Sequence, residues 1–294
     1  MIDKPVGPGS TQVVAAVKRA LREGGYPKVK VGHGGTLDPL ASGLLPVALG
    51  EATKLCGRAL SADKEYQFTI RFGEETRTLD LEGEVVARSE RRPTMAEVEA
   101  VLARFTGAIE QVPPAFSALK VAGRRAYALA RAGEEVALEP RRVRVHHLSV
   151  RAGANRSLPL LEEITLRAAV SKGTYIRSLA RDLARAVDTL GHVAMLRRTR
   201  TGPFGLEAAI SLDKLAELAK ARELEKVLLP LTAGLDDIPA LPVTPDQAGA
   251  LRQGRKLVGI AATAGLHLAT DDNVPVALVE LCEGELRVVR GFNL

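Results

Sequence analysis

Strict alternation of apolar and polar side chains in two separate segments constrains the fold of this 294-residue chain more than any other feature. In 65–73 the apolar positions are Tyr66, Phe68, Ile70 and Phe72. In 164–170 they are Ile164, Leu166, Ala168 and Val170. Because successive side chains of a strand point to opposite faces, a period of two predicts two half-buried strands.

Helical patterns lie between and around these strands. Apolar residues of one face predict a helix over 11–24, which Gly24-Gly25 would end. Thr94 followed by Glu97 is a capping-box signal for another helix. Further helices are expected at about 177–187 and 212–228. Because strands and helices mix without strict βαβ alternation, the sequence predicts an α+β fold.

The C-terminal part of the chain has a different pattern. From Leu241 onward, short β-like runs alternate with turns, and 279–289 reads as a hairpin around Glu283-Gly284-Glu285. We therefore expect two domains, one over 1–235 and a small all-β module over 238–294.

The composition excludes several classes of protein. A content of 46% hydrophobic and 26% charged residues excludes wholesale disorder. The two cysteines, Cys56 and Cys282, fit no CxxC spacing, which argues for a reducing compartment and against a disulfide scaffold or structural zinc. No run approaches the ~20 apolar residues of a membrane span, and the N-terminus does not read as a signal peptide. We expect a cytoplasmic protein without membrane attachment.

The charge balance favours a polyanionic partner. Lysine and arginine number 41 against 35 aspartate and glutamate, a net charge of +6. Arg177, Arg181 and Arg185 share one face of the predicted helix at i, i+4 and i+8. Such a stripe is either a solvated surface or a contact with phosphates, and several basic clusters in one chain favour nucleic-acid binding.

The segment 32–50 is the most unusual of the sequence, and we expect a structured loop flanking a short helix. It matches neither GxGxxG nor GxxxxGK[ST], which disfavours a nucleotide-binding loop. Two readings of Asp38 stay open: a helix N-cap followed by Pro39, or a reactive carboxylate that a ligand approaches past the neighbouring glycines. His33, set among those glycines, is either structural or a contact to a partner.

Other polar clusters allow two readings as well. Tyr175 and Arg177 stand at a predicted strand-to-helix junction, where functional sites often form. The period-two run of Asp80, Glu82 and Glu84 is expected on the solvent side of a strand and turn rather than around a divalent ion.

Five stretches of the sequence resemble the TruB family of tRNA pseudouridine synthases. They are Asp3-Lys4-Pro5, the run from Gly32 to Lys54, Pro114 to Lys120 with Gly123 and Tyr127, Ser171 to Arg177, and His192 to Arg198. The likeness covers about 3–235. It implies the pseudouridine synthase fold, with a mixed, largely antiparallel central sheet flanked by helices, and the tail resembles a small PUA-type RNA-binding barrel. Arg77 departs from the family pattern, which has an acid there, and we expect much of the strand before Lys4 to be missing.

The resemblance implies isomerisation of uridine 55 in the T loop of tRNA to pseudouridine, by base flipping and without a metal or cofactor. Asp38 matches the family's essential carboxylate, Arg177 its partner and Tyr66 the aromatic residue on the target base. Residues that match substrate-binding positions are His33, Tyr66, Tyr175 and Leu196. Whether the carboxylate attacks the base, attacks C1′ or assists a glycal route stays open.

Binding of the RNA backbone is assigned to five basic residues: Lys54, Lys64, Arg181, Arg197 and Arg198. The expected partner is the T stem-loop of tRNA, and the chain is expected to be a monomer. The alternative function is a non-catalytic RNA-binding or tRNA-folding protein. A phosphate-loop nucleotide enzyme using 32–50 is a weaker alternative, because the Lys-Ser/Thr pattern is absent.

Overall fold

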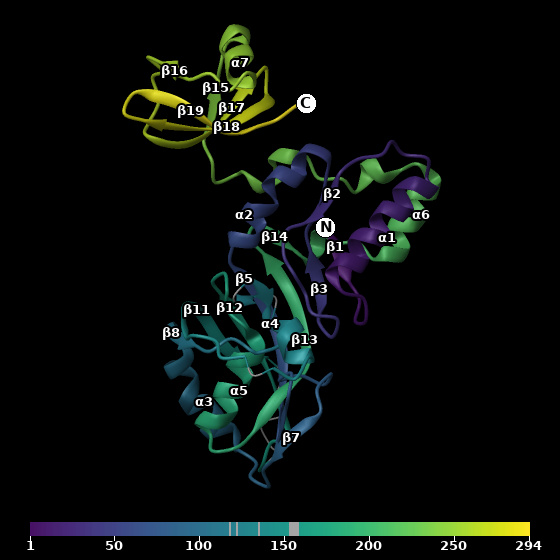
Figure 1. The fold of residues 1–294 in the computed structure, drawn as a ribbon, viewed down its shortest axis with the longest axis vertical. Helices are drawn as coiled ribbons and strands as arrows, with labels where there is room; N and C mark the ends of the chain where they lie inside the picture. The colour runs from purple at the N-terminus through teal and green to yellow at the C-terminus, as the bar shows by residue number, and fades with distance from the viewer. Residues whose placement is uncertain (118, 122, 135, 153–158) are drawn as a thin grey trace. The chain divides into compact units, whose positions relative to one another are not determined.

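The computed structural model describes residues 1–117, 119–121, 123–134, 136–152 and 159–294. Its internal contacts divide the chain into two compact units, and Figure 1 shows the elements of both. The first unit comprises Met1–Val13, Gly35–Pro46 and Leu60–Leu212. The second comprises Val14–Gly34, Val47–Ala59 and Asp213–Leu294.

An eight-stranded mixed sheet is the centre of the first unit, in the order β1-β3-β13-β5-β12-β11-β8, with β14 beside β13. The strands are β1 (Ile2–Lys4), β3 (Ser42–Leu45), β5 (Lys64–Phe72), β8 (Gly107–Gln111), β11 (Arg141–Val150), β12 (Glu163–Val170), β13 (Gly191–Thr201) and β14 (Phe204–Gly205). Among these described strands the pairs are antiparallel except β3 with β13. The predicted alternation is confirmed, since Phe68, Ile70 and Phe72 are buried on β5.

Helices and smaller pairs complete the first unit. They are α3 (Met95–Leu102), α4 (Ala126–Arg131), α5 (Ile176–Ala186), the pair β6 (Glu74–Thr76) and β7 (Val85–Arg88), and the pair β9 (Lys120–Val121) and β10 (Arg124–Arg125). The predicted helix at 177–187 is confirmed by α5, which contacts β13 and β5 and buries Leu179 and Leu183. The predicted capping box is also present: the Thr94 side chain accepts from the Glu97 amide, and Glu97 accepts from Thr94.

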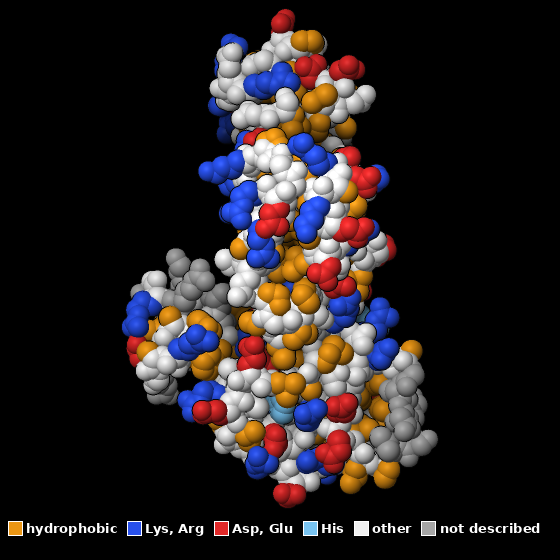
Figure 2. Space-filling model, turned by 90° about the vertical axis from the view of Figure 1, so that its right-hand side faces the viewer, with side chains coloured by type: hydrophobic (Ala, Val, Ile, Leu, Met, Phe, Trp, Pro, Cys, Tyr) orange, Lys and Arg blue, Asp and Glu red, His pale blue; other side chains and the backbone are white. Residues whose placement is uncertain are grey.

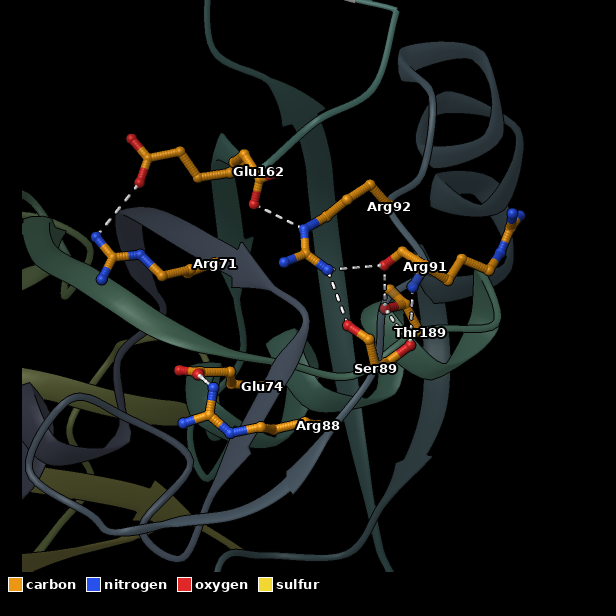
Figure 3. A network of polar contacts seen from close by, with 9 residues as sticks. Arg71, Glu74, Arg88, Ser89, Arg91, Arg92, Glu162 and Thr189 are labelled. Atoms are coloured by element: carbon orange, nitrogen blue, oxygen red, sulfur yellow. Dashed lines mark hydrogen bonds and ion pairs between the residues drawn. The ribbon is translucent and has the colours of Figure 1, made fainter.

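A polar network joins the segment before α3 to its neighbours (Figure 3). Arg92 donates from Nε to the Glu162 carboxylate at 2.7 Å and from Nη1 to the Ser89 carbonyl at 2.9 Å. The Thr189 hydroxyl donates to the Arg91 carbonyl at 2.8 Å. Through these side chains the segment before α3 is bonded to residues next to the ends of β7, α5 and β12.

The second unit holds two antiparallel strands, helices and a separate sheet. Its N-terminal and middle elements are α1 (Ser10–Glu23), from Val14 onward, β2 (Val31–His33), β4 (Val47–Leu49), the 3₁₀ helix η1 (Gly50–Leu55), α2 (Cys56–Ser61), whose last two residues belong to the first unit, and α6 (Leu212–Ala221). The predicted helix 11–24 is confirmed by α1. The predicted helix 212–228 is shorter, because Arg222 adopts a positive φ of 57° and ends it.

The prediction of a short helix within 32–50 is wrong. The segment instead contributes β2, β3 and β4, with a turn at Pro39-Leu40. Gly43 has φ of +100°, which is incompatible with a right-handed helix. A Cβ there would lie 2.2 Å from the Arg198 carbonyl oxygen, so the parallel pairing of β3 with β13 requires glycine.

A curled five-stranded sheet, in the order β15-β17-β18-β19-β16, forms the C-terminal part of the second unit. Its elements are β15 (Ala240–Pro242), α7 (Pro245–Arg252), β16 (Leu257–Val258), β17 (Gly265–Asp271), β18 (Val274–Cys282) and β19 (Glu285–Gly291). The predicted hairpin is confirmed by β18 and β19. The module is not wholly β, since α7 buries Leu251 against Val276 and Leu286. Among the described residues, no helix is long and apolar enough to cross a membrane.

Candidate active site

A pocket of about 280 Å³ opens in the first unit beside the central sheet. Most of the residues predicted to act on a substrate line it: Asp38, Tyr66, Tyr175, Arg177 and Leu196. Lys64 and Arg198, predicted as RNA contacts, line it as well. Residues up to 160 positions apart in sequence thus meet in one concavity, which is the arrangement expected of an active site.

The Arg177 guanidinium is the electrostatic centre of this pocket. Its Nε lies 3.0 Å from Oδ2 of Asp38, and its Nη1 lies 3.5 Å from Oδ2 of Asp80. The Arg177 side chain is only 8% exposed and that of Asp80 3%, whereas that of Asp38 is 37% exposed. Asp38 is therefore the carboxylate of this network that a ligand can reach.

The remaining donors of Arg177 fix its orientation. Nη1 donates to the Thr78 carbonyl at 2.8 Å, and Nη2 donates to the Phe116 carbonyl at 2.9 Å. Because a buried guanidinium is stable only when its donors and charge are satisfied, these four contacts hold it against Asp38. The first residues of α5 are held in turn by β8, where Gln111 accepts from the Tyr175 amide at 2.8 Å.

Asp80 was not anticipated. The prediction that it lies on the solvent side of a strand and turn is wrong. The residue is buried, and its carboxylate accepts hydrogen bonds from the Thr78 hydroxyl and the Glu82 amide. The preceding Leu79 has a φ of +62°, unusual for leucine, and is itself buried. The available signal was the position of Asp80 between two leucines, which is atypical of a solvated face.

The segment that carries Asp38 is anchored by two side chains near the N-terminus. The Leu37 amide donates to the Ser10 hydroxyl at 2.8 Å, and that hydroxyl donates to the Leu37 carbonyl at 3.2 Å. Lys4, 0% exposed, donates to the carbonyls of Pro5, Pro8 and Pro39. The N-cap reading of Asp38 is wrong, because a turn rather than a helix follows and the carboxylate faces Arg177.

Two aromatic residues and a leucine form the less polar part of the pocket. Tyr66 lies on β5, and the buried Leu196 lies on the neighbouring β13. Tyr175 precedes α5, and burial raises the pKa of its phenol. A phenol with a raised pKa stays protonated at neutral pH and can donate a hydrogen bond to a substrate.

Other predicted site residues lie elsewhere. His33 is in β2 and Lys54 in η1, both of the second unit, where Lys54 pairs with Glu51 at 2.7 Å and donates to the Gly291 carbonyl. Arg181 pairs with Asp182, and Arg197 pairs with Asp3 in a two-bond contact. Their roles as RNA contacts stay predictions. Ala118, within the third resembling stretch, lies outside the described residues.

Comparison with family models covers most of the chain. The model described as TruB family pseudouridylate synthase, N-terminal domain, matches residues 20–176. The model described as tRNA pseudouridylate synthase B C-terminal domain matches residues 177–236. Together they include the pocket residues from Asp38 to Arg198.

Similar proteins and structures agree with these models. A Novosphingobium aromaticivorans protein described as tRNA pseudouridine synthase B is 61% identical over 294 residues, covering 100% of this chain and 96% of that protein. One of Zymomonas mobilis with the same description is 58% identical over 293 residues, covering 100% and 95%. A chain in a solved H/ACA RNP bound to a substrate RNA containing 2′-deoxyuridine has a TM-score of 0.73 at 26% identity, covering 100% of this chain and 84% of that one.

A chain of an archaeal box H/ACA sRNP Nop10–Cbf5 complex superposes with a TM-score of 0.72 at 26% identity, over 99% of this chain and 85% of that one. The fold is therefore the pseudouridine synthase fold, followed by a PUA-like half-barrel. The expected class of enzyme is confirmed, and the alternative of a non-catalytic protein is not. The chain belongs to the TruB family of pseudouridylate synthases, enzymes that isomerise uridine in tRNA.

Proposed function

We propose that this synthase acts on uridine 55 in the T loop of tRNA, and that it flips the nucleotide into the pocket around Asp38. The observation that carries the proposal is the half-exposed Asp38 carboxylate, held 3.0 Å from a buried arginine in a pocket that also contains two tyrosines. A stacked base presents neither its glycosidic bond nor its C5 atom to a protein, so the nucleotide must leave the loop for the reaction to occur.

The isomerisation breaks the bond between N1 of uracil and C1′ of ribose, turns the base over and joins C5 to C1′. In the proposed complex Asp38 faces the ribose and base as the reacting carboxylate, and Arg177 keeps it oriented. Tyr66 stacks on the uracil, while Tyr175 and Leu196 form the walls around the nucleotide. Stacking of about 1–3 kcal/mol offsets part of the few kcal/mol that base flipping costs.

The test is an isomerisation assay on a T-loop hairpin with chemical tagging of pseudouridine, since the conversion leaves the mass unchanged. Asp38→Asn should lose turnover by at least 10³-fold while binding of the hairpin stays within about threefold, because the amide is isosteric but not a nucleophile. Product mapped to a uridine other than 55 would contradict the proposed site of modification.

A matched control is Glu163→Gln, which neutralises an exposed carboxylate of the same unit whose side chain is 55% exposed. Its turnover should equal that of the wild type within twofold. Retained turnover in Asp38→Asn would reject Asp38 as the reacting group.

We propose further that residues 1–235 carry the chemistry and that 238–294 add affinity for RNA, in a monomeric cytoplasmic enzyme that uses neither metal nor cofactor. The support for the division is the separate sheet and core of the C-terminal part, built around Leu251, Val276 and Leu286. His33, which matches a substrate-binding position of the family, is proposed to enter the T loop and support its extruded conformation.

A further inference from the structure

Arg198 occupies a central place beside the pocket. It lies on β13, opposite Tyr66 of β5 on one side and Gly43 of β3 on the other. The residue is 1% exposed, which makes it one of the largest fully buried side chains among the described residues. It thus stands between the strand that carries Tyr66 and the segment that carries Asp38.

The donors of Arg198 go to the backbone on both sides of Asp38. Nε donates to the Leu44 carbonyl at 2.8 Å, and Nη1 donates to the Thr36 carbonyl at 3.3 Å. One acceptor is two residues before Asp38 and the other six residues after it. A single planar group therefore ties both ends of the segment to the centre of the sheet.

This arrangement is costly for stability alone. None of the described carboxylates forms an ion pair with Arg198, and its buried Nη2 has no hydrogen-bond partner there. Burying a charge without a carboxylate partner opposes folding, and an apolar side chain would avoid that cost. A role in positioning accounts for a guanidinium at this place.

The neighbouring backbone is shaped around the guanidinium. At Gly35, three residues before Asp38, an added Cβ would lie 3.3 Å from Nη1 and 3.5 Å from Nη2 of Arg198. Gly35 also has a φ of +153°. The backbone of the Asp38 segment approaches the guanidinium closely only because this position has no side chain.

We propose that Arg198 is a positioning residue for catalysis: through Thr36 and Leu44 it sets the place of Asp38 relative to Arg177 and Tyr66. The inference rests on the proposed role of Asp38. It assigns to Arg198 an effect on turnover rather than on the affinity for RNA. A displacement of the reacting group by about 1 Å can cost a hundredfold in rate.

Arg198→Lys tests the proposal, because an ammonium keeps the charge but lacks the fixed fork that reaches both carbonyls. On the T-loop hairpin we expect kcat to fall at least tenfold with KM within threefold. We expect Arg198→Ala to lose activity as well, and added millimolar guanidinium should raise the kcat of this variant at least fivefold. The control is Arg200→Lys on the same strand, whose Nε bonds the Gly202 carbonyl and whose activity should be unchanged.

Gly35→Ala gives a second test that leaves Arg198 in place. The methyl group should displace the segment from the guanidinium and lower kcat without raising KM. In folded Arg198→Lys, amide hydrogen exchange should be faster in 36–45 than in the wild type and unchanged in 64–72.

The outcomes separate the two proposals. A kcat of Arg198→Lys within twofold of the wild type, with Asp38→Asn inactive, overturns the positioning role and leaves the proposed function intact. A raised KM with unchanged kcat also overturns it, and assigns Arg198 to RNA binding. An active Asp38→Asn overturns the proposed function and the inference with it.

Discussion

At the scale of single residues, three buried cations among the described residues of the first unit bond backbone carbonyls rather than carboxylates. Lys4 bonds three carbonyls, Lys64 bonds those of Leu60 and Ala62, and Arg198 bonds two. Burial lowers the pKa of Lys4 and of Lys64 to about 8, although nearby carboxylates oppose the shift. Each cation fixes a turn or segment at the pocket, at a cost in stability.

That cost predicts a pH dependence of stability. The pKa of Lys4 is about 8 in the folded state and about 10.4 in the unfolded state, so between these values the unfolded chain binds more protons. Stability from this group therefore rises with pH from about 8 to 10. We expect the unfolding free energy of the wild type, relative to Lys4→Met, to increase by about 1–2 kcal/mol between pH 7 and pH 9.5.

The measurement is urea unfolding of the wild type and of Lys4→Met at pH 7 and at pH 9.5. Lys64 is present in both, so its contribution cancels in the difference. An unchanged difference would show that Lys4 is not perturbed by burial.

At the scale of elements, the sequence patterns predicted structure wherever periodicity alone decides it. The strands at 65–73 and 164–170, the helix from Thr94 and the hairpin near Glu283 are all present. The pattern failed where a distant strand decides: 42–45 pairs with β13, more than 150 residues later, so the expected helix does not form.

The residues of the candidate site could be predicted from motifs that resemble a family, but not from local patterns of hydrophobicity and charge. Asp38 and Arg177 stand in stretches that resemble a family, Tyr66 stands on the strand that alternation predicts, and the structure brings the three together. The burial of Asp80 was not predicted because its partner Arg177 is 97 positions away, and no local pattern signals such a pair. The burial of Lys4 and Arg198 was not predicted either, since isolated basic residues are usually exposed.

The capping box of α3 predicts that removing its N-cap side chain lowers the free energy of unfolding measurably. Thr94→Ala removes the acceptor of the Glu97 amide and leaves that donor without its side-chain partner. We expect destabilisation of about 1 kcal/mol by urea unfolding. Thr106→Ala is the control, because its hydroxyl bonds the Leu102 carbonyl after the same helix without capping its N-terminus. A loss from Thr94→Ala no larger than that of the control would contradict the capping role.

At the scale of the whole molecule, many basic side chains lie close to acidic ones. On the face that Figure 2 shows, lysine and arginine are interspersed with aspartate and glutamate. Many arginines pair with carboxylates, as Arg185 does with Glu75 and Arg58 with Asp237. The net charge of +6 is thus a small excess over many local pairs.

The excess still predicts salt-dependent binding of tRNA. About three phosphate contacts would weaken binding about 20- to 40-fold between 50 and 200 mM salt. Binding is measured with Asp38→Asn, so that no turnover intervenes. Reversing the exposed Arg255 and Arg290 of the C-terminal module should make the salt dependence shallower. An identical slope for this variant would contradict the proposed contribution of 238–294 to RNA affinity.

The parallel pairing of β3 with β13 has a consequence for folding during synthesis on the ribosome. The ladder that seats the Asp38 segment joins residues about 155 positions apart, and the contact of Asp3 with Arg197 closes a loop of 194. Synthesis proceeds from the N-terminus at about 5–20 residues per second. At that rate the segment that carries Asp38 is synthesised about 8 to 30 seconds before the strand that pairs with it. We therefore expect that isomerisation of tRNA begins only after β13 has been synthesised and has paired with β3.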